Sequence, residues 1–252
     1  MAGSTRDEAF AVVRRLHAQG LAASIDLFGE QVRDATAARA AADDYVSLAG
    51  ALADLPAETY LSIDLSHVGL DLSTDLCRDL VARIVAALPS QARLQIGAED
   101  SVRAAGIFEV ILALARNGAP VMATIQANLR RSDADAMLLA DVGVPIRLVK
   151  GAYVEPSEVA RRWGEETDIA YVHLAHQLHA AGDDVVIATH DPVLREALLA
   201  AMPTLSVEML LGVRSEDAIR VAQHRHPVRI YVPYGRDWFR YWMRRVAEAR
   251  GA

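Results

Sequence analysis

Eight short apolar segments recur along the chain, and most are followed by a stretch long enough for a helix. The predicted strands cover residues 21–28, 60–66, 93–97, 120–126, 146–153, 184–189, 205–211 and 228–232. The longest predicted helices between and after them cover residues 30–53, 74–87, 100–117, 131–141, 156–181 and 236–250. Strands that alternate with helices over about 250 residues predict a (β/α)8 TIM-type barrel of the α/β class. A doubly wound sheet is the alternative, but it needs a glycine-rich first turn, and Phe28-Gly29-Glu30 is a poor one.

The chain reads as a single domain with a helix in front of it. Residues 5–19 have an apolar stripe and are followed by Gly20, so we expect an N-terminal helix within residues 1–20 and a barrel over residues 21–252. No linker and no low-complexity segment interrupts the barrel stretch.

Composition excludes several classes of protein. No apolar run is long enough to span a membrane, and no secretory signal begins the chain. Cys77 is the single cysteine, which favours a reducing cytoplasm. The formal net charge of −7 argues against a nucleic-acid partner. No cluster of histidine, cysteine or acidic residues has the spacing of a metal site, so no metal is expected.

Polar residues collect where the predicted strands end, which is where a barrel of this kind carries its chemistry. Lys150 ends the fifth strand, and of the 26 lysines and arginines it is the only lysine. Alternation along the strands directs an unusually polar set of side chains inward. That set comprises Ser62, Asp64, Gln95, Glu99, Thr124, Gln126, Arg147, Arg229 and Tyr231. Such an interior is typical of a cavity that holds a large polar ligand.

The last predicted helix carries a second polar cluster. Tyr241, Arg244, Arg245 and Glu248 are spaced so that they share one helix face. Adjacent arginines suit bidentate binding of a carboxylate or a phosphate. The cluster is either a solvated face or part of a site over the barrel mouth.

Several of these motifs together resemble the proline dehydrogenase family. The resemblance rests on Arg147-Leu-Val-Lys-Gly-Ala-Tyr153, Ile125-Gln126, Ala188-Thr-His190, Glu208-Met-Leu-Leu-Gly-Val-Arg214, Tyr231-Val-Pro-Tyr-Gly235 and Met243-Arg-Arg245. It implies a distorted barrel with non-covalently bound FAD. It also implies oxidation of L-proline to pyrroline-5-carboxylate, with a quinone or another acceptor taking the electrons.

The resemblance also implies roles for individual residues. Arg147 is expected near the flavin N5 edge and Gln126 at the pyrimidine end of the ring. The remaining cofactor-binding residues are expected to be Val149, Lys150, Gly151, Thr189 and His190. The arginine pair Arg244 and Arg245 would bind the substrate carboxylate, with Glu248 supporting it. The pocket walls are expected to be Tyr153, Leu210, Tyr231 and Tyr241.

Three positions depart from the family pattern, and at one of them Val154 stands where the family has a tryptophan. Asp64 stands where the family has a lysine, and Gly97 stands where it has an acidic residue. A carboxylate at 64 favours a substrate with an additional amine, unless it pairs internally with Arg147 or Arg244. These departures leave open a divergent family member and a catalytically degenerate flavin-binding barrel. A third alternative is an enzyme that forms a Schiff base on Lys150, because lysines at barrel strand ends can form imines. Peripheral membrane contact and the oligomeric state stay open.

Overall fold

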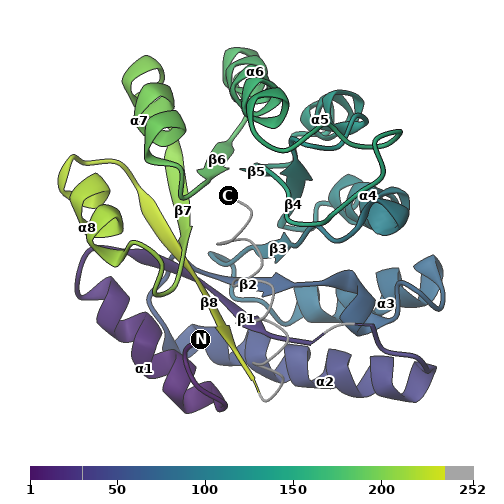
Figure 1. Cartoon of the computed structure of the whole chain (residues 1–252). Helices are drawn as coiled ribbons and strands as arrows, with labels where there is room; N and C mark the ends of the chain where they lie inside the picture. Colours follow the sequence, from purple (N-terminus) through teal and green to yellow (C-terminus); the bar gives the residue numbers. More distant parts are fainter. Residues whose placement is uncertain (30, 236–252) are drawn as a thin grey trace.

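The computed structural model describes residues 1–29 and 31–235 and shows a closed barrel of eight parallel strands (Figure 1). Each strand pairs with the next, and β8 pairs with β1. The strands are β1 (Ala22–Leu27), β2 (Thr59–Ile63), β3 (Leu94–Ile96), β4 (Val121–Gln126), β5 (Ile146–Val149), β6 (Val185–Ala188), β7 (Ser206–Leu210) and β8 (Val228–Tyr234). The predicted TIM-type barrel is confirmed.

Helices surround the barrel, as Figure 1 shows. The helix α1 precedes β1, and α2 to α8 follow β1 to β7 in turn. They are α1 (Arg6–His17), α2 (Ala35–Ala51), α3 (Thr74–Ala86), α4 (Ser101–Arg116), α5 (Ser132–Ala140), α6 (Glu165–Ala181), α7 (Pro192–Ala201) and α8 (Ser215–Gln223), with short 3-10 helices η1 (Leu52–Asp54) and η2 (Leu65–Val68). The predicted last helix, 236–250, lies outside the described residues.

The helix α1 packs against β1 and β8. Thr5 and Glu8 form a capping box at its start, in which each side chain accepts from the other's backbone N–H. Its own side chains Val13 and Leu16 are buried. The N-terminal helix thus covers the seam where the barrel closes.

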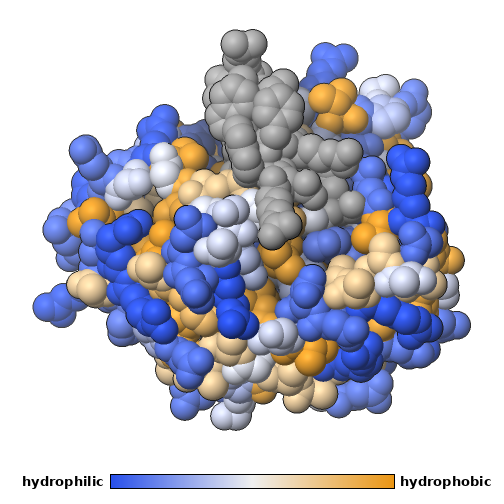
Figure 2. All heavy atoms as spheres, turned by 90° about the horizontal axis from the view of Figure 1, so that it is seen from below, coloured by the Kyte–Doolittle hydropathy of each residue, from blue (hydrophilic) through white to orange (hydrophobic). Residues whose placement is uncertain are grey.

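The two faces of the strands differ in chemistry because side chains alternate along a strand. Outward side chains such as Ile25, Leu61, Leu148 and Ile187 are fully buried beneath the helices. Burial of apolar surface at about 25 cal/mol per Å² is the main force that holds the helices on the barrel. The solvent face on the α1 and α2 side mixes hydrophilic with scattered hydrophobic residues (Figure 2).

The inward set is polar, as predicted. Ser62, Gln95, Thr124 and Gln126 are buried inside the barrel. Strand register places them side by side: Ser62 pairs with Gln95, and Thr124 pairs with Arg147. The interior therefore contains hydrogen-bonding groups rather than the usual packed aliphatic layers.

The predicted helix 156–181 was wrong at its start, since α6 begins only at Glu165. Arg161 donates to the carbonyl oxygens of Ala127 (2.9 Å) and Leu129 (2.8 Å), which ties this segment to the end of β4. Gly164 then adopts φ 89°, a left-handed value that interrupts a right-handed helix. The resulting loop lies beside the carboxyl ends of the strands.

Three other boundaries were also too generous. The strand predicted over 60–66 ends at Ile63, because the chain turns into η2 directly after Asp64. The helix predicted over 30–53 begins at Ala35, where the Asp34 side chain accepts from the N–H of Ala37 and caps it. The strand predicted over 146–153 ends at Val149. All three differences lie at the barrel mouth, where the sequence is most polar.

Candidate active site

The carboxyl ends of the strands bring most of the predicted site residues to one end of the barrel. Those within the described residues are Asp64, Gln126, Arg147, Val149, Lys150, Gly151, Tyr153, Thr189, His190, Leu210 and Tyr231. The other four, Tyr241, Arg244, Arg245 and Glu248, lie outside the described residues.

Arg147 forms a buried ion pair across the barrel interior. Its Nε lies 2.5 Å from Oε1 of Glu208 on β7, and the side chains are 14% and 0% exposed. Among the described residues, no aligned hydrogen bond accompanies this contact, so the attraction is mainly electrostatic. Gln95 of β3 donates to the same Oε1 at 3.0 Å. The carboxylate of Glu208 therefore fixes the position of the Arg147 guanidinium.

Glu208 is a site residue that the sequence patterns did not single out. Alternation along β7 would have found it, because Glu208 lies two residues before Leu210 and shares its inward face. The ion pair of Arg147 is with Glu208, and the alternative in which Asp64 pairs internally with Arg147 or Arg244 stays a prediction.

Tyr231 lies between Arg147 and a buried carboxylate. The Arg147 guanidinium is 5.9 Å from the centre of the Tyr231 ring, a cation–π distance. The Tyr231 hydroxyl donates to Asp26, which is 2% exposed. Asp26 is a second residue that the motifs missed. It fixes the orientation of the phenol at the mouth.

Tyr45 of α2 supports Asp26 from outside the barrel. Its hydroxyl donates to the carbonyl oxygen of Leu27 at 2.7 Å and lies 3.3 Å from Oδ1 of Asp26. Burial raises the pKa of Tyr45, and the charges of Asp26 and Asp64 raise it further. The phenol therefore stays neutral and acts as a donor.

Lys150 is held between two carboxylates. Its Nζ lies 2.6 Å from Asp168 and 2.9 Å from Asp191. Burial alone would lower the pKa of Lys150, but hydrogen bonds and charges from these two residues outweigh burial and raise it. Lys150 is therefore a firmly protonated ammonium near neutral pH.

The end of β6 is joined to the neighbouring elements. Asp191 caps α7 by accepting from Val193 (3.0 Å) and Leu194 (3.2 Å), and its own N–H donates to Thr189 Oγ1 at 3.1 Å. His190 Nε2 accepts from the N–H of Leu210 at 3.1 Å. A neutral His190 therefore carries its proton on Nδ1, and the contact links β6 to β7.

Gln126 ends β4 with its side chain oriented by the backbone. Its Nε2 donates to the carbonyl oxygen of Glu99 at 2.8 Å, which leaves Oε1 as the acceptor that can face a ligand. Beside it, Gly151 has φ 119°, and the space of a side chain there is filled by the Asn128 amide. Only glycine lets the backbone pass this closely.

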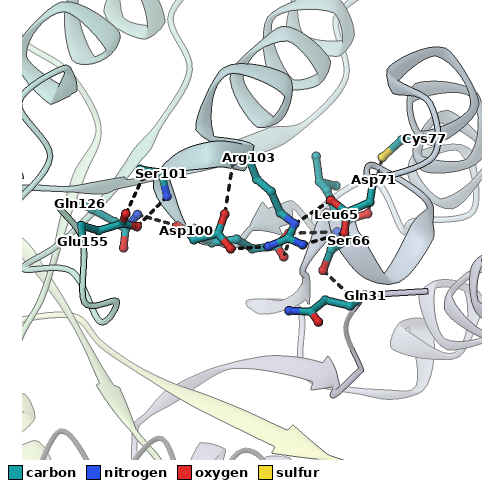
Figure 3. Close-up of polar contacts among 11 residues, drawn as sticks. Gln31, Leu65, Ser66, Asp71, Cys77, Asp100, Ser101, Arg103, Gln126 and Glu155 are labelled. Carbon is teal, nitrogen blue, oxygen red and sulfur yellow. Dashed lines mark hydrogen bonds and ion pairs between the residues drawn. The ribbon is translucent and has the colours of Figure 1, made fainter. Parts of the chain in front are cut away.

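An ion-pair network holds the loops after β2 and β3 together (Figure 3). Arg103 of α4 binds both oxygens of Asp71 at 2.7 Å and also pairs with Asp100. Glu99 accepts from the N–H of Ser66 at 2.9 Å. Burial raises the pKa of the Glu99 carboxyl, while Ser66 and Arg103 act in the opposite direction. Glu99 is therefore turned toward η2 and α4.

The loop after β5 is anchored to the same network. Glu155 accepts from the backbone N–H of Ser101 at 2.6 Å and from its hydroxyl at 2.5 Å, at the start of α4. Figure 3 shows this contact beside Gln126. The ends of β2 to β5 are thus linked by side chains, which keeps the mouth residues at fixed positions.

Two kinds of feature are absent from residues 1–29 and 31–235. No helix there is long and apolar enough to cross a membrane. No group of three or more histidine, cysteine or acidic side chains is placed to hold a metal ion.

Comparison with known proteins agrees on one family. The family model described as proline dehydrogenase matches residues 9–252. Proline dehydrogenase 2 of Bacillus subtilis (strain 168) is 29% identical over 254 residues, covering 98% of this chain and 84% of that protein. The proline dehydrogenase of Deinococcus radiodurans is 33% identical over 261 residues, with coverage of 98% and 84%.

Solved structures share the fold. Proline utilization A (PutA) from Bdellovibrio bacteriovorus, inactivated by N-propargylglycine, superposes with a TM-score of 0.87 at 19% identity, covering 97% of this chain and 32% of that one. PutA from Corynebacterium freiburgense gives 0.81 at 20%, with 94% and 29% covered. The chain thus spans about a third of the length of these two PutA chains.

The family match and the curated relatives both extend over nearly the whole chain. The chain therefore belongs to the proline dehydrogenase family, whose named members are oxidoreductases that act on the CH–NH group of proline.

Proposed function

We propose that this protein is an FAD-dependent dehydrogenase that oxidises L-proline, or a closely related cyclic or secondary amino acid, to the corresponding imine. With proline, the ring carbon that lies beside the nitrogen and does not bear the carboxylate loses a hydride, and the nitrogen loses a proton, which gives pyrroline-5-carboxylate. The electrons then pass to a quinone or another acceptor. The observation that carries the proposal is Arg147, held by Glu208 at the mouth of the barrel.

The residues at the mouth suit a flavin. The guanidinium of Arg147 has five N–H groups, and Glu208 contacts the Nε side. In the part of the chain that the structure describes, no hydrogen bond engages its terminal nitrogens, so they are available to a ligand. Gln126 offers Oε1, an acceptor for a ring N–H. Val149, Lys150, Gly151, Thr189 and His190 complete the proposed cofactor-binding set.

Bound FAD supplies the hydride acceptor, and the protein positions the reactants around it. We assign Arg147 the task of placing positive charge beside the ring, which favours added electron density there. Arg244 and Arg245 bind the substrate carboxylate as a bidentate pair, and Glu248 supports them. The walls of the substrate pocket are Tyr153, Leu210, Tyr231 and Tyr241. These walls would exclude water and hold the reacting carbon in a fixed orientation beside the ring.

Spectroscopy tests the proposal directly. We expect the purified protein to be yellow, with the absorption of an oxidised flavin that denaturation releases as FAD. Anaerobic addition of L-proline should bleach that absorption, and D-proline should not. A colourless protein that binds no added FAD would contradict the proposal and favour a degenerate barrel.

The location of the protein follows from the proposed acceptor. We infer a cytoplasmic protein that makes peripheral contact with a membrane surface when its acceptor is a quinone. The free, buried Cys77 is consistent with a reducing compartment. Turnover with a water-soluble quinone, compared with turnover on quinone-loaded vesicles, tests this part.

The ion pairs of Lys150 make a separate prediction about Schiff-base chemistry. An amine attacks a carbonyl only when deprotonated, and the raised pKa of Lys150 keeps it protonated. We therefore expect that borohydride, added with aldehyde or keto-acid substrates, leaves Lys150 unmodified in the intact protein. Trapped adduct on the Lys150 peptide, detected by mass spectrometry, would support an aldolase instead.

A further inference from the structure

Asp64 and Gly97 lie side by side at the barrel mouth. Ser62 of β2 pairs with Gln95 of β3, so the positions two residues further on are also neighbours. The N–H of Gly97 donates to the carbonyl oxygen of Ile63 at 2.8 Å, which confirms this register beyond the strands. Both positions share the inward direction of Ser62 and Gln95.

The carboxylate of Asp64 occupies the space of a side chain at position 97. A Cβ added to Gly97 would lie well inside 3.0 Å of Asp64 Oδ1 and 3.3 Å from its Cγ. Gly97 has no left-handed backbone conformation, so its φ does not require glycine. The reason for a glycine here is therefore room for the Asp64 carboxylate.

Several charged side chains lie around this pair at the barrel mouth. On β1, Asp26 is another carboxylate near the end of a strand, and it lies close enough to Tyr45 for hydrogen bonding. On the other side, Arg147 lies in β5 and Lys150 directly follows this strand. Glu208 and the two carboxylates around Lys150 offset those cations. The ends of β1 and β2 thus add two further carboxylates, Asp26 and Asp64, to the barrel mouth.

We propose that Asp64 is a specificity-determining residue, positioned by Gly97, that selects amino-acid substrates carrying a second, cationic amine. The inference rests on the proposed function and names the substrate class of that same site. A carboxylate has about four acceptor positions, so Asp64 can keep partners within the protein and still accept from a ligand ammonium. Hydrogen bonds between charged groups contribute about 1.5–3 kcal/mol, which corresponds to roughly tenfold or more in affinity.

The first test compares L-proline with 4-amino-L-proline, which carries the extra amine on its ring. In the unaltered protein we expect kcat/KM for 4-amino-L-proline to be about tenfold higher, mainly through KM. The Asp64→Ala variant should lose this preference. A ratio near one in the unaltered protein would overturn the proposed substrate class.

A double-mutant cycle tests the role of Gly97. Gly97→Ala displaces the carboxylate and should remove most of the preference, but in an Asp64→Ala background it should change the ratio by less than about twofold, since the clashing atoms are gone. Gly50→Ala is the matched control, because a Cβ at Gly50 meets nothing within 4 Å. Effects of Gly97→Ala that are equal in both backgrounds would overturn the positioning role.

A binding measurement separates this inference from the proposed function. Calorimetry compares cyclopentanecarboxylate with 3-aminocyclopentanecarboxylate, two ring acids that differ by the amine, and needs no turnover. If binding favours the amine in a way that depends on Asp64 and Gly97, while no amino acid reduces the flavin, the specificity role of the two residues is supported. The same result contradicts the proposed oxidation. If proline bleaches the flavin but neither assay shows a preference for the amine, the proposed oxidation is supported. That result would overturn the specificity role of Asp64 and Gly97.

Discussion

Replacing Arg147 by methionine is expected to lower kcat/KM for proline by at least about 100-fold and to destabilise the fold by about 3–5 kcal/mol. The activity falls because the positive charge beside the proposed flavin is lost. The stability falls because Glu208, whose side chain is 0% exposed, keeps a buried charge without its ion-pair partner. Steady-state kinetics and denaturant unfolding measure the two effects separately.

A second substitution distinguishes these two causes. In Arg147→Met with Glu208→Gln, no charge of the pair remains, so most of the lost stability should return while activity stays low. Arg93→Met is the matched control: its ion pair with Asp184 is 36% and 58% exposed, and its loss should cost under about 1 kcal/mol. Recovery of activity in the double variant would show that Arg147 only balances Glu208.

The barrel could be predicted because its signal is local. Each strand is a short apolar segment, and its outward side chains, such as Ile25 and Leu148, are buried by the helix that follows. The inward polarity of Ser62, Gln95 and Thr124 could also be predicted, because alternation depends only on the sequence. The errors fell where tertiary contacts override local propensity, as at α6, where the contacts of Arg161 hold the preceding loop out of the helix.

The pairings inside the site could not be predicted in the same way. Arg147 and Glu208 lie on β5 and β7, which are not adjacent, so their contact depends on the closed geometry of the barrel. The fit of Asp64 over Gly97 depends on the register of β2 against β3. Compared with the family pattern, position 64 has the opposite charge and position 97 has lost its charge. In the structure, the Asp64 carboxylate occupies the space that a side chain at position 97 would need.

Arg229 provides the contrasting case, an interior arginine at the opposite end of the barrel. It pairs with Ala22 at the start of β1, whereas Tyr231 pairs with Ser24 nearer the mouth. Its Nη1 donates to the carbonyl oxygens of Ala23 (2.8 Å) and Glu58 (2.5 Å). Its guanidinium also lies 3.5 Å from the centre of the Tyr60 ring. Arg229 thus closes the amino-terminal end of the barrel.

Replacing Arg229 by methionine should therefore destabilise the fold by about 3 kcal/mol, through two charge-assisted hydrogen bonds and a cation–π contact. The kinetic constants at saturating FAD should change by less than about twofold, because this end of a barrel contributes to stability and the other end to chemistry. Denaturant unfolding and steady-state kinetics on the same preparation check both statements. A large fall in kcat with normal stability would mean that Arg229 affects the mouth through the polar residues of the barrel interior. In that case Arg147 and Glu208 would not act independently of the opposite end of the barrel.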